Sequence, residues 1–325
     1  MAQLLTYHQI DRHHWQTLVQ QSKTGTWFQR PEAYDFFASQ SEVMEPFAYA
    51  VEKEGQLSAV CVGYVTKERS AIKQFFTRRA IIIGGPAVAD TCTNEDLSGL
   101  LEAIHADIQS KTIYIETRNF NDYTSWREAF ERTGFSYKPH LNFHVDPSVN
   151  KLSENRKRQL KRSNATVLDA AGEAEIREWY DVLAELYRTK VKTPLWPIEF
   201  FLEAYRQDIA KFLLVQHEER IIGGSMVVAD EKTVYEWFEC GLNAQYKDQY
   251  PSVMATFAGI QLAQQSCCTR YDMMGAGEPG VPYGVRDFKA EFGGKLVEHG
   301  RFLCVCKPML YRIGATAVQL IRRIP

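Results

Sequence analysis

The chain has 325 residues, 45% of them hydrophobic, and a formal net charge of −2. This length suits two domains of ordinary size, and the near-neutral charge excludes a protein whose whole surface binds nucleic acid. The sequence has no run of about 18 apolar residues that would predict a membrane span, and its start lacks the pattern of a secretory signal, so we expect a cytoplasmic protein.

The seven cysteines have no regular spacing, which indicates a reducing compartment rather than a disulfide framework. Cys304 and Cys306 are two residues apart, and Cys267 and Cys268 are adjacent. Neither pair is followed by a second pair or by a histidine at the spacing of a zinc site. From the sequence we therefore expect no metal site.

Alternating apolar residues and turn signals predict the elements of the first half of the chain. They are a strand at 47–53, a turn at Glu54–Gly55, a strand at 56–65, a helix from an Asn94 N-cap to Gln109, and a strand at 112–118. Asp146-Pro147-Ser148 then interrupts the pattern. We place a domain boundary there, with a first domain at 1–148 and a second at 149–325.

Five cations open the second half within the seven residues 156–162, on a helix expected to begin near Ser153. They suit phosphate groups of tRNA, a nucleotide sugar or a lipid diphosphate, and they equally suit a solvated helix face. The candidates for anion binding are Arg156, Arg158, Lys161 and Arg162.

The order of elements then repeats that of the first half. The expected elements are strands at 212–216 and 221–230 around a turn at 218–220, a strand at 233–241, a helix from Ser252 to Gln265, and a strand at 269–275. Two copies of one α+β unit explain this repetition. Within the strand at 233–241, Glu239 shares a face with Tyr235 and Trp237, and a carboxyl beside aromatic rings is a candidate base with a raised pKa.

A final helix is expected at residues 308–323, because apolar residues recur there at helical spacing. They are Leu310, Ile313, Ala317, Leu320 and Ile321. Such a helix either packs on the protein or contacts the surface of an anionic bilayer.

A further motif, Asp287-Phe288-Lys289 followed by Phe292-Gly293-Gly294, resembles the carboxy-terminal signature of the Fem family. These are non-ribosomal peptidyl transferases that add amino acids to peptidoglycan precursors, and polysaccharide-associated proteins are related to them. Thr26-Trp27-Phe28-Gln29, Ile83-Gly84-Gly85-Pro86 and the basic segment are also similar to the family pattern. The resemblance implies two tandem GNAT-like (acyl-CoA N-acyltransferase fold) domains with mixed sheets flanked by helices.

The resemblance also implies where the substrates bind, with the acceptor on the first domain and the donor on the second. The final helix is expected to return to the first domain. Together with Glu239, chosen above from its aromatic neighbours, the candidate catalytic residues are Lys289 and Asp272. The donor-binding candidates are Phe288, Tyr246, Tyr250, Ser252 and Tyr283, and the acceptor-binding candidates are Trp27, Phe28 and Gln29. Ala33 replaces a common tryptophan of the family, which places a peptidoglycan acceptor in doubt.

The expected activity is therefore transfer of an acyl or aminoacyl group to an amine of a cell-envelope precursor, at the inner face of the membrane. No tightly bound cofactor is expected, and the donor co-substrate is aminoacyl-tRNA or acyl-CoA. No glycine occurs between Asn243 and Ser252, where acetyl-CoA enzymes of this fold carry a pyrophosphate-binding loop, so acyl-CoA is the less expected donor. The alternatives are acyl-CoA-dependent N-acetylation of an amino sugar or lipid amine, and a catalytically silent binding protein.

Overall fold

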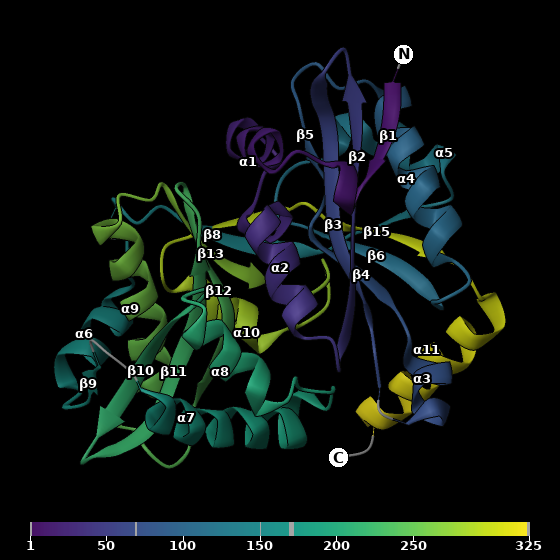
Figure 1. The fold of residues 1–325 in the computed structure, drawn as a ribbon. Helices are drawn as coiled ribbons and strands as arrows, with labels where there is room; N and C mark the ends of the chain where they lie inside the picture. Colours follow the sequence, from purple (N-terminus) through teal and green to yellow (C-terminus); the bar gives the residue numbers. More distant parts are fainter. Residues whose placement is uncertain (1, 69, 150, 169–171, 324–325) are drawn as a thin grey trace. The chain divides into compact units, whose positions relative to one another are not determined.

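The structure is a computed structural model that describes residues 2–68, 70–149, 151–168 and 172–323 (Figure 1). The chain forms two compact units. Unit 1 comprises Met1–His140 with Glu298–Pro325, and unit 2 comprises Leu141–Val297. The described part of the chain contains no helix that is both long and apolar enough to cross a membrane.

Unit 1 is built on a mixed sheet with the strand order β1-β2-β3-β4-β6-β15-β7, to which β5 adds by pairing with β3. Its strands are β1 (Ala2–Thr6), β2 (Met44–Lys53), β3 (Gln56–Thr66), β4 (Ala80–Gly84), β5 (Ala87–Val88), β6 (Tyr114–Asn119), β7 (Ser136–Lys138) and β15 (Arg301–Val305). Its helices are α1 (Arg12–Gln21), α2 (Pro31–Ser39), α3 (Ala71–Thr77), α4 (Asn94–Ile108), α5 (Arg127–Arg132) and α11 (Pro308–Arg323), with short 3₁₀ turns at Tyr7–Gln9, Trp27–Gln29 and Thr124–Trp126.

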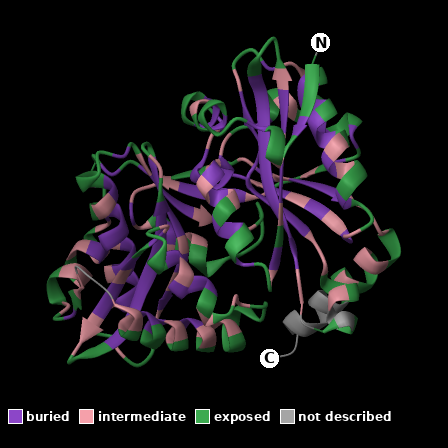
Figure 2. Ribbon diagram, in the orientation of Figure 1, coloured by how far each residue is buried: buried purple, intermediate pink, exposed green. Residues whose placement is uncertain are grey.

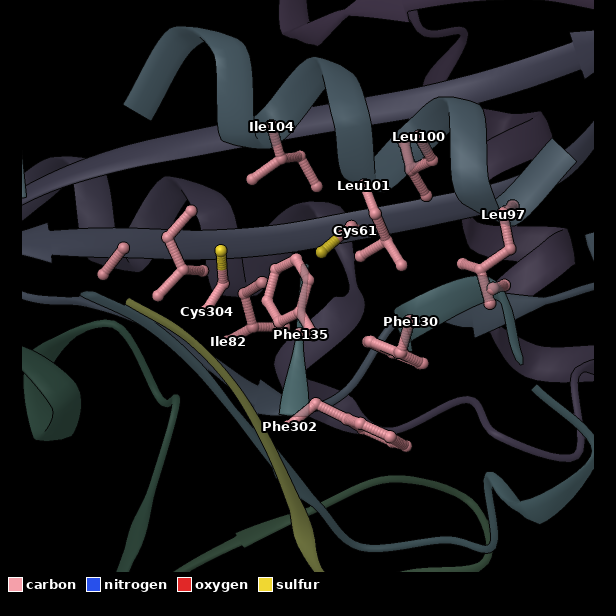
Figure 3. Close-up of a cluster of buried hydrophobic side chains, with 14 of the residues drawn as sticks. Cys61, Ile82, Leu97, Leu100, Leu101, Ile104, Phe130, Phe135, Phe302 and Cys304 are labelled. Carbon is pink, nitrogen blue, oxygen red and sulfur yellow. The ribbon is translucent and has the colours of Figure 1, made fainter. Parts of the chain in front are cut away.

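The core of unit 1 lies between this sheet and α4. Leucine and isoleucine side chains from one face of α4 pack against strand residues such as Cys61, Ile82 and Cys304 (Figure 3). Phe302 of β15 stacks on Phe130 of α5, with ring centroids 3.9 Å apart. A strand near the carboxy terminus therefore contributes to the central packing of the first unit.

Unit 2 has a second mixed sheet, with the order β14-β8-β13-β12-β11-β10-β9. Its strands are β8 (Leu141–Val145), β9 (Thr166–Val167), β10 (Lys211–His217), β11 (Arg220–Ala229), β12 (Thr233–Gly241), β13 (Arg270–Gly275) and β14 (Lys295–Glu298). Its helices are α6 (Glu154–Arg162), α7 (Glu173–Leu186), α8 (Ile198–Arg206), α9 (Pro251–Gln265) and α10 (Gly284–Ala290), with a π-helical turn at Tyr187–Val191. In both units the buried residues gather along the central strands (Figure 2).

The two sheets share one pattern, including an exchange of strands. In each sheet one strand lies between the strand that follows the long helix and the edge strand: β15 between β6 and β7, and β8 between β13 and β14. β8 follows β7 of the first sheet in the chain but pairs in the second sheet, and β15 follows β14 of the second sheet but pairs in the first. The expected boundary at residue 148 differs from this division, because β8 pairs with β13 and so belongs to unit 2.

The structure also corrects two expected helix starts. The N-cap of α4 is Thr93 rather than Asn94, since the Thr93 side chain accepts a hydrogen bond from the Asp96 amide and the Asp96 carboxylate accepts one from the Thr93 amide. Helix α9 begins at Pro251, preceded by Tyr250 at a φ of +48°, so Ser252 lies inside the first turn. Proline is favoured at the first helical position because its missing N–H would have no partner there.

The expected final helix corresponds to α11, which belongs to unit 1 and contacts α3. Leu310 is half-buried and Ile313 is exposed. The side chains of Ala317, Leu320 and Ile321 lie outside the described part of the structure.

Candidate active site

The candidate site in unit 2 lies where β12 and β13 part. These two parallel strands pair from Thr233–Arg270 to Tyr235–Asp272, although β12 continues to Gly241 and β13 to Gly275. The pairing of β13 with β8 shifts register after Asp272, and Met274 has a φ of +61°. The ends of β12 and β13 therefore extend beyond their shared ladder, and polar side chains gather around them.

Lys289 of α10 lies buried against the end of β13. Its ammonium group donates hydrogen bonds to the backbone carbonyls of Met273 and of Gly275, the second at 2.9 Å. Burial lowers the pKa of Lys289, while the nearby carboxyl groups of Glu236, Asp272 and Glu239 oppose this shift. The cation thus satisfies carbonyl groups that the strand ladder no longer uses.

Glu236 of β12 is also buried, and its Oε1 accepts hydrogen bonds from the Tyr271 hydroxyl at 2.8 Å and the Thr256 hydroxyl at 2.9 Å. Burial raises the pKa of this carboxyl, against the effects of Lys289 and its two hydroxyl donors. Sequence reasoning did not select Glu236. A β-bulge at Trp237 places Glu236, opposite Val227, on the same face of β12 as Glu239, opposite Ser225, so the expected alternation that put Glu239 on the face of Tyr235 does not hold. No sequence signal shows this bulge, nor that Thr256 and Tyr271 come to meet Glu236.

Glu239 lies further along β12, beyond the last recorded pair with β13. Its Oε1 is buried and has no hydrogen-bond partner among the described residues. Burial, and then the negative charge of Glu236, raise the pKa of Glu239 to about 8, although the Ser252 hydroxyl opposes the shift. A carboxyl with this pKa is divided between its acid and base forms near neutral pH, as a general base requires.

Asp272 of β13 lies between the turn that ends β13 and His144 of β8. Its Oδ1 accepts a hydrogen bond from the Met274 amide at 2.8 Å, and its Oδ2 lies 3.2 Å from Nε2 of His144 on β8. Burial opposes its ionisation, but the charges of His144 and Arg270 lower the pKa of Asp272. Asp272 is fully buried.

The segment before α9 is held by side chains. Nδ2 of Asn243 donates to the Ser252 hydroxyl at 2.7 Å, and Oδ1 of Asn243 accepts from the Ser252 amide at 3.3 Å. At the end of α6, the Ser163 hydroxyl donates to the Gln249 carbonyl at 2.9 Å. This contact fixes the end of α6 beside the start of α9, a helix terminus whose dipole favours anions.

Among the four predicted anion-binding residues, the structure separates Arg156 from the others. Arg156 is buried, with its guanidinium 4.5 Å from the centre of the Phe288 ring and 3.4 Å from Glu291. It therefore anchors α6 to the signature segment, so it is not available to an external anion. Arg158, Lys161 and Arg162 are exposed, the last two in the final turn of α6.

The two signature glycines are explained by close packing. A Cβ at Gly293 would lie 2.4 Å from the Lys151 carbonyl oxygen, and its φ is +77°. A Cβ at Gly294 would lie 2.8 Å from the carbonyl oxygen of His144. Only glycine permits these approaches, so the Gly-Gly pair positions β8, which carries the partner of Asp272.

The predicted donor-side aromatic residues lie in different surroundings. Phe288 and Tyr250 are half-buried against the core of unit 2, and Tyr246 packs on a smaller cluster that contains Val215. Tyr283 is exposed.

The three predicted acceptor residues lie in the interior of unit 1. Trp27, Phe28 and Gln29 are buried, and the Gln29 side chain donates to the carbonyls of Val62 at 3.0 Å and Ile83 at 2.8 Å. The amide of Gln29 thus bridges β3 and β4. The structure assigns this segment to packing, because its side chains have partners inside the protein.

Comparison with known proteins agrees with this architecture. Residues 149–289 match the family model described as an acetyltransferase (GNAT) domain. No curated protein has a sequence similar enough to count as a match.

Solved structures show the same fold at low sequence identity. FemX superposes with a TM-score of 0.71 at 13% identity, over 96% of this chain and 99% of FemX. A tandem GNAT protein from the clavulanic acid biosynthesis pathway gives 0.57 at 7% identity, over 94% of this chain and 99% of that one. The C-terminal domain of a putative lysylphosphatidylglycerol synthetase from Agrobacterium fabrum gives 0.54 at 11% identity, over 91% of each chain. The predicted fold of two tandem GNAT domains is confirmed, and residues 149–289 of the second domain match an acetyltransferase (GNAT) domain.

Proposed function

We propose that unit 2 forms an amide by transferring an acyl or aminoacyl group to an amine at the parted ends of β12 and β13. The observation that carries this proposal is Glu239, whose buried Oε1 has no hydrogen-bond partner among the described residues at the point where the strands separate. Burying such an atom costs free energy unless another molecule bonds to it. An incoming ammonium or amine group supplies the missing hydrogen.

In the proposed reaction the nitrogen of the acceptor amine attacks the donor carbonyl. A carbon–nitrogen bond forms, and the ester or thioester bond of the donor breaks. Glu239 takes the proton that the amine loses and passes it to the departing oxygen or sulfur, which leaves as a hydroxyl or thiol. Lys289 and Asp272 act as positioning residues, since the first holds the end of β13 through two carbonyls and the second holds its turn through the Met274 amide. Thr256 and Tyr271 fix Glu236, whose charge contributes to the raised pKa of Glu239.

The donor in this proposal carries phosphate groups. Lys161 and Arg162 are exposed at the end of α6, and the contact of Ser163 with Gln249 keeps them beside the start of α9. Aminoacyl-tRNA is the favoured donor, because the segment before α9 has no glycine between Asn243 and Ser252 and the Asn243 side chain occupies the Ser252 amide.

The acceptor in this proposal is an amine of a cell-envelope precursor at the inner face of the membrane. Unit 1 by itself exposes apolar side chains, including Phe75 of α3 and Met309 of α11, which would suit contact with a membrane surface. The second candidate function is acyl-CoA-dependent N-acetylation of an amino sugar or lipid amine. The match of residues 149–289 to an acetyltransferase domain favours it.

The test supplies purified protein with two separate donor pools, charged tRNAs and acyl-CoAs, together with an extract of cell-envelope precursors. Mass spectrometry follows donor consumption and new amides. New amides from charged tRNA only would support the proposed function, and products from acyl-CoA only would favour the second candidate. Salt-sensitive binding of a donor without any product would contradict both and indicate a binding protein.

A further inference from the structure

Unit 1 contains a group of metal-ligating side chains that does not include any of the candidate active-site residues of unit 2. One histidine and two cysteines meet there: His105 from the last turn of α4, Cys304 within β15, and Cys306 just after β15. One ligand atom from each residue, an imidazole nitrogen or a thiol sulfur, lies within 4.8 Å of the other two. Nothing in the acyl-transfer proposal uses these residues.

The fold explains why the three residues converge. Cys304 and Cys306 are two residues apart along an extended segment, so their side chains leave the same face of the sheet. Helix α4 covers that face, and its Ile104 and Ile108 share a hydrophobic cluster with Cys304. Figure 3 shows the sulfur of Cys304 pointing toward α4. His105 directly follows Ile104, at the end of the helix that lies over the two thiols.

The chemistry of the group selects a particular class of ion. Two thiols and an imidazole are soft ligands that favour zinc over magnesium or calcium, which prefer oxygen. Tetrahedral zinc with Zn–S bonds of about 2.3 Å places its ligand atoms roughly 3.5–4 Å apart. Ligand atoms within 4.8 Å of one another therefore reach this geometry by small side-chain rotations.

The side chains of this group are available to bind a metal ion. All seven cysteines are free, so no disulfide occupies Cys304 or Cys306. Within the residues that the structure describes, no hydrogen bond or ion pair is recorded for the imidazole of His105, which leaves its nitrogens available as ligands. His105 and Cys306 are half-buried, so solvent can reach the remaining coordination position.

We propose that His105, Cys304 and Cys306 bind one zinc ion, with water as the fourth ligand. The ion would join α4 to the strand β15, which enters the sheet of unit 1 from the other end of the sequence. Because binding to the folded state stabilises that state, zinc would hold this late strand in place.

The test uses the full-length protein, reduced and freed of metal with a chelator. Zinc is titrated against a competing indicator, and cobalt(II) is added separately to detect thiolate-to-metal charge-transfer absorption. We expect one zinc per chain, the cobalt absorption, and a rise in the melting temperature with zinc. Cys304→Ser, Cys306→Ser and His105→Gln should each weaken zinc binding by more than about 100-fold, beyond the 10–100-fold effect of residues outside the ligand set.

Cys61→Ser is the matched control, because Cys61 is buried in the same cluster as Cys304 but is not one of the three ligands. It should retain zinc binding and the cobalt absorption whatever it does to stability. A dissociation constant for zinc above about 1 μM in the reduced wild type would overturn the proposal. Equal zinc binding by the wild type and all three ligand variants would also overturn it. So would purified protein that contains a Cys304–Cys306 disulfide and still binds no zinc after that disulfide has been reduced.

Discussion

Glu239 is the residue whose ionisation is most clearly coupled to folding. Its pKa is raised from 4.5 to about 8 by burial and by Glu236. A raised pKa means that the carboxyl binds its proton more tightly in the folded state than in the unfolded state. The stabilisation of the folded state by this proton is fully present below pH 4.5 and is lost as pH rises through about 8.

The substitution Glu239→Gln should therefore increase the free energy of unfolding relative to the wild type, increasingly so from pH 5 to pH 9. The difference should approach a few kcal/mol, because each pKa unit corresponds to about 1.4 kcal/mol. Urea denaturation at several pH values measures it. Glu278→Gln, at an exposed position, is the control and should show no such trend; an identical pH dependence in the wild type and Glu239→Gln would contradict the assignment.

Lys289 should contribute to stability as well as to activity. Lys289→Met leaves the carbonyls of Met273 and Gly275 buried without their donor, which should cost about 2–5 kcal/mol of unfolding free energy. Thermal and chemical denaturation measure this cost, with Lys295→Met, an exposed neighbour, as the control. A stability equal to the wild type would show that these hydrogen bonds do not hold β13.

For single residues, the sequence predicts candidate catalytic residues that the structure brings close together, since Lys289, Asp272 and Glu239 all lie near the parted ends of β12 and β13. Their roles depend on partners that periodicity cannot reveal. Asp272 meets His144 from a strand more than a hundred residues earlier, and the Lys289 ammonium bonds backbone rather than substrate. From the sequence we expect Gln29 to bind an acceptor, whereas the structure shows its buried amide bridging two strands. The local sequence around Gln29 is compatible with both roles.

Helix α6 is the element on which the proposed phosphate contacts depend. Replacing Lys161 and Arg162 with glutamine should weaken donor binding. It should also make the slope of log affinity against log salt concentration shallower, by the amount that corresponds to roughly two phosphate contacts, because binding then releases fewer counterions. Fluorescence anisotropy with labelled tRNA at several salt concentrations measures both quantities. Lys157→Gln is the control on the same helix, since Lys157 pairs with Glu154 at 2.8 Å; equal losses in the two variants would contradict a specific anion site.

Elements with strong local signals were predicted well. The turn at Glu54–Gly55 joins β2 to β3, and the helix from Ser153 begins as expected because the Ser153 side chain accepts a hydrogen bond from the Arg156 amide. Helix starts with competing signals shifted by a residue. Thr93 and Asn94 both suit an N-cap, and only the reciprocal bonds with Asp96 decide between them.

For the whole molecule, the exchange of β8 and β15 is the property that the sequence could not show. Local periodicity identifies strands but not their partners. Asp146-Pro147-Ser148 therefore predicts a boundary, although the strand just before it belongs to the second sheet. The doubled α+β unit was predicted correctly, because each copy carries its own hairpin, long helix and following strand.

The exchange predicts which fragments fold. Residues 141–297 should give a cooperatively unfolding domain, whereas residues 149–297, which lack β8, should not, because the edge of β13 would be left without its partner. Circular dichroism and amide hydrogen exchange compare the two fragments. Equal stability of both would show that β8 is dispensable for unit 2.

The central claim is that Glu239 accepts the proton of the attacking amine at the parted strands of unit 2. The most direct measurement is the single-turnover rate of amide formation by the wild type and by Glu239→Gln, with the donor and acceptor identified by mass spectrometry, across pH 6 to 9. The account predicts a wild-type rate that rises with pH toward a plateau above about 8, and a loss of about 10²–10⁴-fold in the variant. A variant that stays folded and retains the wild-type rate would contradict it.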